Sequence, residues 1–147
     1  MPVLTSRRLF LIAVPTILVA GGAIAARQMF AVPSDLDLSL RKTSADGRYV
    51  VSIAPEVATV TVGPMHAWTV SIRTAKGKPV ERASIAIDGG MPQHGHGLPT
   101  APAVTKALGD GRFLVEGMRF NMSGWWVLNF AIDAPEGADT VTFNVVL

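Results

Sequence analysis

Residues 125–132 read WWVLNFAI, and from Trp126 onward a large apolar side chain occupies every second position. Side chains of a β-strand point alternately to the two faces of a sheet, so this period of two predicts a strand with one buried face. Five other stretches repeat the alternation: residues 49–53, 68–72, 83–87, 113–115 and 141–145. The chain is therefore expected to consist mainly of half-buried strands.

Turn-forming residues separate these stretches. Glycine occurs with aspartate, lysine or proline at residues 45–47, 76–79, 109–111 and 135–137. No stretch of this region has the apolar stripe of an amphipathic helix. About seven short strands in succession predict an all-β fold, an immunoglobulin-like antiparallel β-sandwich. An apolar leader helix is expected before it.

Composition limits the function classes. The chain has 147 residues, which suits one domain, and it has no cysteine. The lack of cysteine excludes a disulfide framework, a thiolate zinc finger, an iron–sulfur cluster and a cysteine nucleophile. Without Arg7 and Arg8 of the leader, basic and acidic residues are equal at eleven each. No nucleic-acid partner is expected, because binding phosphates requires a basic surface.

The first 26 residues resemble a secretory leader. Arg7 and Arg8 precede an apolar run and then small residues, which is the layout of a signal peptide, and residues 6–11 resemble a twin-arginine export signal. Alternatively, residues 9–26 form an uncleaved anchor, since 18 apolar residues span roughly 27 Å as a helix. Either way the domain is exported, and it is periplasmic, soluble after cleavage or anchored to the inner membrane. Residues 27–37 are expected to be a spacer and residues 38–147 the β-sandwich domain.

One stretch, residues 88–102, departs from the alternation. It reads DGGMPQHGHGLPTAP and is so rich in glycine and proline that a loop is expected throughout. A structureless connection of this length is longer than packing requires, which favours a functional role.

Histidine and methionine gather near the expected strand ends. Met91, His94 and His96 lie in the long loop, and His66 comes at the start of the strand that contains Trp68. Met118 and Met122 follow Gly117, a residue able to form a bulge that re-aims side chains. Because the loops of a sandwich cluster at its two ends, all six side chains can converge.

This donor set points to copper. A mixture of thioether and imidazole ligands without thiolate suits Cu(I) or Cu(II) better than zinc or magnesium. Two alternatives stay open at this stage. The methionines can simply fill gaps in the core, with the histidines hydrogen-bonded in their loop. His66, His94 and His96 can instead form a three-imidazole zinc site with an open fourth position.

The motifs MPxHGHG, residues 91–97, and GMxFxMxGxW, residues 117–126, together resemble the YtkA-like domain family of exported bacterial proteins. The resemblance covers residues 80–132. It implies an immunoglobulin-like extracytoplasmic domain, similar to small periplasmic modules found around copper-containing oxidases. It implies no established activity.

We therefore expect a non-enzymatic, exported domain that carries copper for a periplasmic or membrane metalloprotein. The predicted ligands are Met91, His94, His96 and one or more of Met118, Met122 and His66. The rival hypothesis from another class is a protein interaction module that binds no metal. Its binding surface would be formed by the long loop and an outward-facing Trp125.

Overall fold

The computed structural model of the protein describes residues 32–147, within which the compact body spans Ser34–Leu147. The expected leader, residues 1–26, and residues 27–31 of the expected spacer lie outside the described residues. In the part of the chain that is described, no helix is long and apolar enough to cross a membrane.

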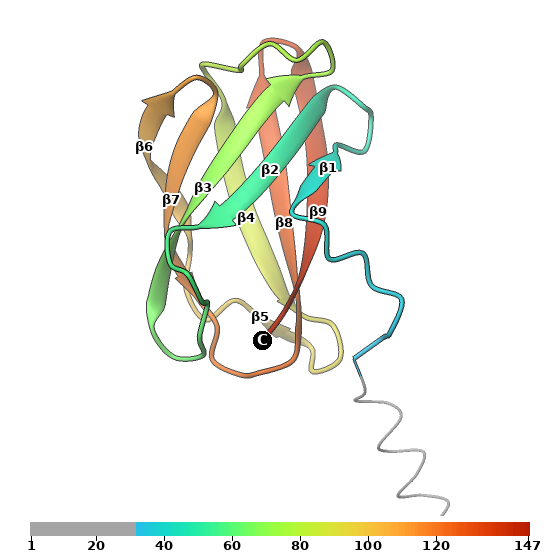
Figure 1. The fold of residues 1–147 in the computed structure, drawn as a ribbon, viewed down its shortest axis with the longest axis vertical. Helices are drawn as coiled ribbons and strands as arrows, with labels where there is room; N and C mark the ends of the chain where they lie inside the picture. The colour runs from blue at the N-terminus through green and yellow to red at the C-terminus, as the bar shows by residue number, and fades with distance from the viewer. Residues whose placement is uncertain (1–31) are drawn as a thin grey trace, which may run out of the picture. The chain divides into compact units, whose positions relative to one another are not determined.

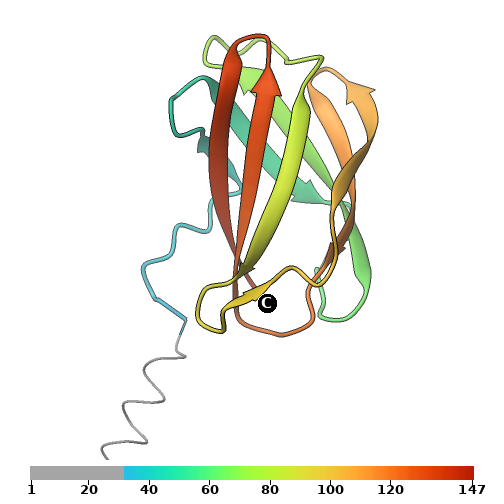
Figure 2. The same cartoon turned by 180° about the vertical axis from the view of Figure 1, so that it is seen from behind.

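The body is an antiparallel β-sandwich (Figures 1 and 2). One sheet has the order β1-β2-β3-β7-β6 and the other β5-β4-β8-β9. Nine strands are present among residues 32–147: β1 (Arg41–Thr43), β2 (Tyr49–Pro55), β3 (Met65–Thr74), β4 (Ser84–Met91), β5 (His96–Gly97), β6 (Ala103–Gly109), β7 (Arg112–Arg119), β8 (Trp125–Ala134) and β9 (Gly137–Val146). The prediction of an all-β antiparallel fold is confirmed, whereas the expected number of about seven strands is too low.

The strands that the alternation did not reveal have physical reasons to escape it. β1 and β5 contain three and two residues, too few to show a period. β6 is an edge strand that is exposed along most of its length, so apolar side chains do not mark one of its faces. An alternation of apolar and polar residues reveals only strands that are long enough and have one buried face, and none of these three strands meets both conditions.

Alternating apolar side chains of both sheets form a single core. Every residue of the alternation in β8 points inward, and Trp126 has no exposed surface. The predicted bulge is present in β7: two residues of β7 face one residue of β3, and Gly117 has a positive φ of 85°. The bulge turns both Val115 and Met118 into the core although they lie three positions apart.

The expectation that residues 88–102 form a loop throughout is wrong. β4 continues through Gly89 and Gly90 to Met91, and His96–Gly97 returns beside it as β5. Glycine is required here by close packing of the backbone. A Cβ atom on Gly89 would lie 2.4 Å from the carbonyl oxygen of Val127, and one on Gly90 would lie 2.2 Å from that of His96. These glycines therefore allow β4 to continue at a place where the glycine content had predicted the end of the strand.

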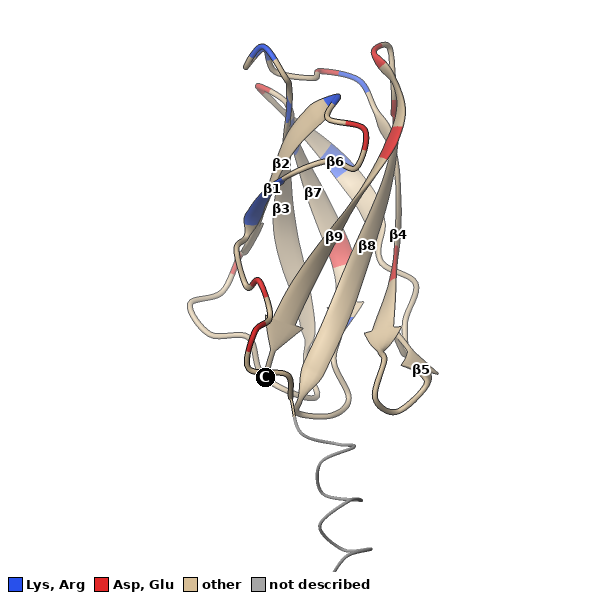
Figure 3. Ribbon diagram, turned by 90° about the vertical axis from the view of Figure 1, so that its right-hand side faces the viewer, with Lys and Arg blue, Asp and Glu red and all other residues tan. Residues whose placement is uncertain are grey.

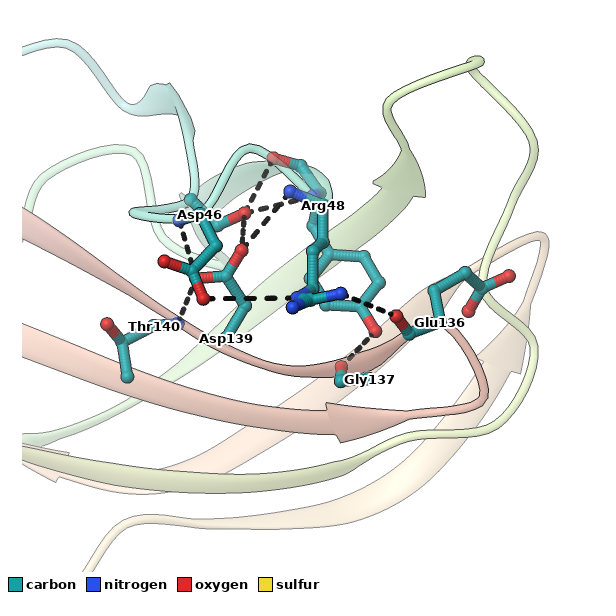
Figure 4. Close-up of polar contacts among 8 residues, drawn as sticks. Asp46, Arg48, Glu136, Gly137, Asp139 and Thr140 are labelled. Carbon is teal, nitrogen blue, oxygen red and sulfur yellow. Dashed lines mark hydrogen bonds and ion pairs between the residues drawn. The ribbon is translucent and has the colours of Figure 1, made fainter.

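At the end of the sandwich opposite to β5, a buried carboxylate joins the two sheets (Figure 4). Asp139 of β9 accepts a 2.6 Å hydrogen bond from the Ser44 hydroxyl, and further hydrogen bonds from the backbone amides of Asp46, Arg48 and Thr140. Ser44, Asp46 and Arg48 belong to the turn between β1 and β2, so the carboxylate ties this turn to the other sheet. These hydrogen bonds to its charged form outweigh the effect of burial and lower the pKa of Asp139 to about 2.

Candidate metal site at one end of the sandwich

Three connections that carry or adjoin the predicted ligands lie at the same end of the sandwich, at the bottom of Figure 1. They are residues 56–64 between β2 and β3, the hairpin that joins β4 to β5, and residues 120–124 between β7 and β8. The first and third connections touch, since the amide of Gly63 donates a 2.8 Å hydrogen bond to the carbonyl of Phe120. The end that contains these connections is called the His/Met end below.

The hairpin between β4 and β5 holds two imidazoles side by side. The rings of His94 and His96 are nearly parallel, 9° apart in plane, with centroids separated by 6.1 Å. The turn is tight because the amides of His94 and Gly95 both donate to the carbonyl of Met91, and Gly95 has a positive φ of 65°. His94 is half-buried and His96 is exposed. The hairpin therefore presents both imidazoles at the surface, His96 more than His94.

Met91 lies directly opposite His96 in the hairpin. Side chains of directly opposed residues in an antiparallel pair have Cβ atoms about 5 Å apart. The thioether of Met91 is nevertheless buried, and its terminal methyl carbon packs close to Gly124 of the β7–β8 connection. Met91 therefore links the imidazole pair to the interior of the His/Met end.

His66 and Met118 form a second pair inside the sandwich, opposed to each other in β3 and β7. Both are buried. His66 lies near the start of its strand, as expected, but residues 56–64 fold over it and its Nε2 lies 2.8 Å from the carbonyl oxygen of Thr61. Because a carbonyl only accepts, Nε2 is the donor, which leaves Nδ1 as the ring nitrogen that could bind a metal ion. A metal-binding histidine commonly shows this arrangement, with one ring nitrogen anchored to a backbone carbonyl.

Met122 is separate from the buried methionines. It lies in the β7–β8 connection and is partly exposed. Its carbonyl accepts a 3.0 Å hydrogen bond from Nε1 of Trp126, whose ring meets Phe120 edge to face at 5.2 Å between centroids. Trp126 therefore fixes the backbone that presents Met122.

The six predicted residues thus share one end of the molecule but fall into two groups. His94, His96 and Met122 are accessible, whereas His66, Met91 and Met118 are buried. Within residues 32–147, no three side chains of His, Cys, Asp or Glu are grouped so that they could hold a metal ion. The structure therefore offers no ready three-imidazole zinc site, because His66 lies in the interior and the other two histidines lie on the hairpin.

Trp125 faces outward, as its position next to the core-facing Trp126 predicts. It is only half-exposed, and its Nε1 donates a 3.0 Å hydrogen bond to Asn144 Oδ1. The hydrogen bond to β9 gives Trp125 a structural role on the outer face of its sheet.

One further thioether at the His/Met end escaped the sequence reasoning. Met65, the first residue of β3, is 65% exposed and lies opposite Arg119 of β7. The available signal was its parity: it precedes the inward-facing His66, so its side chain must point outward.

Charge is nearly absent from the His/Met end. Residues 57–66, 89–102 and 117–126 contain a single charged residue, Arg119. In Figure 3 the loops around β5 contain no charged position, while most of the coloured positions lie toward the opposite end. Soft ligands and apolar side chains are thus concentrated at one end, away from most of the carboxylates and cations.

A substitution of Gly90 tests whether close packing of the hairpin positions the imidazole pair. We expect Gly90→Ala to push β5 away from β4, because its Cβ would meet the His96 carbonyl, and to cost about 2 kcal/mol of unfolding free energy. Urea unfolding and amide exchange of the hairpin measure this. Gly97→Ala is the matched control, because its nearest contact would be an ordinary 3.7 Å. Equal effects of the two substitutions would contradict the packing argument.

Comparison with known proteins gives one match. No curated protein and no solved structure matches this chain. A family model does match, over residues 42–131, a segment that runs from β1 into β8 and contains all six predicted ligands. That family is described as YtkA-like.

Proposed function

Because this chain belongs to the YtkA-like family, and the six predicted ligands lie within the matched residues, we propose a function from the chemistry of the His/Met end. The protein is an exported, non-enzymatic domain that binds copper at the β4–β5 hairpin. It delivers the metal to a periplasmic or membrane metalloprotein. Residues 1–26 direct export, and the domain is released by cleavage or stays anchored through residues 9–26.

The observation that carries this proposal is the pair of parallel imidazoles on the hairpin, with Met91 opposite one of them. Imidazole and thioether together prefer copper among the common metal ions. The thioethers bind at any pH because they carry no proton to lose. A carrier must also release its metal, and few, accessible ligands suit transfer better than a closed cage.

Binding requires a small rearrangement of the hairpin. Two nitrogens bound to one tetrahedral ion lie about 3.3 Å apart, given metal–nitrogen bonds of about 2.0 Å. The ring centroids of His94 and His96 are separated by 6.1 Å. Rotation of the two side chains toward each other brings their ring nitrogens closer, and Met91, opposite His96, supplies a thioether. His66 and Met118 belong to the buried group, so their contribution to binding is tested separately.

We also propose that the fold is immunoglobulin-like, and the strand order of the two sheets supports this. β2, β3, β7 and β6 adjoin in the manner of strands A, B, E and D, while β4, β8 and β9 adjoin in the manner of C, F and G. β5 extends the second sheet beside β4 at the position of strand C′, and β1 adds a short outer strand. In such domains the loops at the ends are the usual sites of binding.

Copper retention by a double variant tests the proposed function. We expect the domain to retain Cu(I) against a competing chelator, and His94→Ala/His96→Ala to lower the affinity at least tenfold, because two of the imidazole ligands are lost. Lys76→Ala/Lys78→Ala, in the turn between β3 and β4, is the matched control on an exposed turn. Equal and negligible retention by all three proteins would overturn the copper proposal.

The contribution of the buried ligands is measured separately. His66→Ala and Met118→Leu each remove one inner donor, and the unfolding free energy of each variant is recorded beside its copper affinity. A loss of affinity with normal stability assigns the residue to the metal site. A loss of stability with normal copper affinity shows that the residue contributes only to packing.

A metal-free interaction module is the second candidate function, and the accessible apolar side chains of the His/Met end favour it. It predicts that the unaltered domain binds its partner equally with and without copper, because no metal takes part. The two candidates therefore differ in whether copper is retained and needed.

A further inference from the structure

Apolar side chains protrude from two connections of the His/Met end. Val57 and Val62 are each 41% exposed, Met65 is 65% exposed and Met122 is 37% exposed. The first three belong to residues 57–65, and the hydrogen bond from Gly63 to Phe120 holds this segment against the connection that carries Met122. Exposed apolar side chains on adjoining loops are candidates for an interaction surface.

The lack of charge restricts what covers this surface. Residues 57–66, 89–102 and 117–126 contain one charged residue, Arg119, and Glu56 at the start of the β2–β3 connection accepts a hydrogen bond from Thr69. Two separate charges of opposite sign give neither an acidic nor a basic partner a complementary patch. Asp37, which lies near this end, is already paired with Lys42 at 2.9 Å. A surface attracted by anionic lipid would instead carry several cations.

The start of the body lies at the same end. The carbonyl of Asp37 accepts a 3.0 Å hydrogen bond from Asn144, a β9 residue that lies opposite Val127 of β8. Val127 in turn lies opposite Gly90, at the base of the hairpin. The chain therefore enters the body level with the His/Met end rather than with the end that contains Asp139.

A tether at this position favours one orientation toward a membrane. Residues 27–33 extend to at most about 25 Å, whereas the ten residues of β9 rise about 33 Å. With residues 9–26 as a membrane anchor, this link is too short to place the opposite end of the body against the bilayer while the entry point stays at the His/Met end.

We infer that, in the anchored form, the His/Met end docks on the neutral lipid surface of the membrane, with Val57, Val62, Met65 and Met122 entering the interface. This inference rests on the part of the proposed function that keeps residues 9–26 uncleaved. It places the imidazole pair at the membrane surface, where a membrane metalloprotein can be reached by lateral diffusion.

Single cysteines test the docking, because the chain has none of its own. Val62→Cys, Met65→Cys and, at the opposite end, Lys78→Cys are made separately in the full chain and labelled with an environment-sensitive fluorophore. Each protein is reconstituted into phosphatidylcholine vesicles with and without brominated lipid. We expect quenching at positions 62 and 65 to exceed that at position 78 at least twofold. Equal quenching at all three positions would overturn the inference.

Further arms separate the alternative explanations. Val57→Asp in the Met65→Cys background should lower the quenching to the level of position 78 while the protein stays with the vesicles. Replacing one third of the lipid by anionic phosphatidylglycerol should leave the quenching unchanged, and an increase would overturn the neutral-lipid assignment. The fluorophore can instead remain exposed to water on pure lipid vesicles and become shielded only in bacterial membrane vesicles. That result would assign the surface to a membrane protein, and the bilayer inference would be wrong.

Copper retention of the same labelled variants distinguishes this inference from the proposed function. Loss of docking with normal copper retention removes the membrane inference alone. Loss of copper retention with docking preserved removes the carrier function alone. A full chain that does not stay with the vesicles overturns the anchored form and the docking together.

Discussion

Replacing Asp139 by alanine is expected to lower the unfolding free energy by about 3 to 5 kcal/mol, a large part of the stability of a domain of this size. The substitution removes the acceptor of the Asp46, Arg48 and Thr140 amides in a site that is 6% exposed, and it leaves the Ser44 hydroxyl with the Tyr49 carbonyl alone. Buried donors without partners cost more than the hydrogen bonds themselves contribute. Urea unfolding at pH 7 measures the loss.

Asp46→Asn is the matched control, because it alters an exposed carboxylate of the same turn, 3.9 Å from Arg48 Nε, and leaves the backbone amide in place. Its expected effect is below about 0.5 kcal/mol. A loss for Asp139→Ala as small as that of the control would show that the buried carboxylate does not join the sheets.

The same carboxylate makes stability depend on pH in a defined window. The pKa of Asp139 is about 2 in the folded protein and 3.8 for an unperturbed aspartate. Its contribution to stability is therefore complete above pH 4 and is lost as the pH falls from 4 to 2. Asp139→Asn removes the titrating group, so its unfolding free energy should fall less than that of the natural sequence over this interval.

Replacing Trp126 by alanine is the second large effect that we expect, with a loss of about 4 kcal/mol or failure to fold. The side chain has no exposed surface and packs edge to face with Phe120. Its Nε1 also holds the Met122 carbonyl, so the connection between β7 and β8 loses its anchor. Thermal unfolding of the variant and the exchange rate of the amides in residues 120–124 report the two effects.

The neighbouring residue provides the control. Trp125→Ala removes an equally large side chain that is half-exposed, and it should cost about 1 kcal/mol. Trp126→Phe keeps a ring in the core but lacks the N–H group, so it separates packing from the hydrogen bond to Met122. If the two alanine substitutions cost the same, the assignment of Trp126 as a central core residue is wrong.

The alternation of apolar residues was enough to predict most of the sandwich. It placed Tyr49, Trp68, Trp126 and Phe143 on inward faces, and all four are buried. It also predicted which of two adjacent tryptophans enters the core. A half-buried strand is visible in sequence because solvent and core impose opposite demands on successive residues.

The prediction from sequence was incomplete where backbone packing or buried hydrogen bonds, and not the alternation of apolar residues, determine the structure. Gly89 and Gly90 read as a break, yet they continue β4, because two neighbouring backbones approach too closely for any Cβ atom. Asp139 was overlooked although it shares the parity of Val141 and Phe143. A carboxylate inside an apolar alternation signals a buried polar network whose donors lie elsewhere in the chain.

The ligand set was predicted by residue type and by its expected position at strand ends. The six residues do lie at one end, but sequence did not reveal that they separate into an accessible and a buried group. For His66 the burial depends on how residues 56–64 fold over the ring, which contacts the Thr61 carbonyl. For Met91 and Met118 it depends on packing between strands that are distant in the chain. Metal affinity itself stays a prediction until the copper experiment is done.

The position of Leu147 has a practical consequence. Its amide and carbonyl form reciprocal hydrogen bonds with Gly124, so the last residue of the chain lies at the same end as the imidazole pair. A polyhistidine purification tag fused there would place extra imidazoles beside His94 and His96 and would bind copper itself. Affinity measurements therefore call for a tag that contains no metal ligands, or for its complete proteolytic removal.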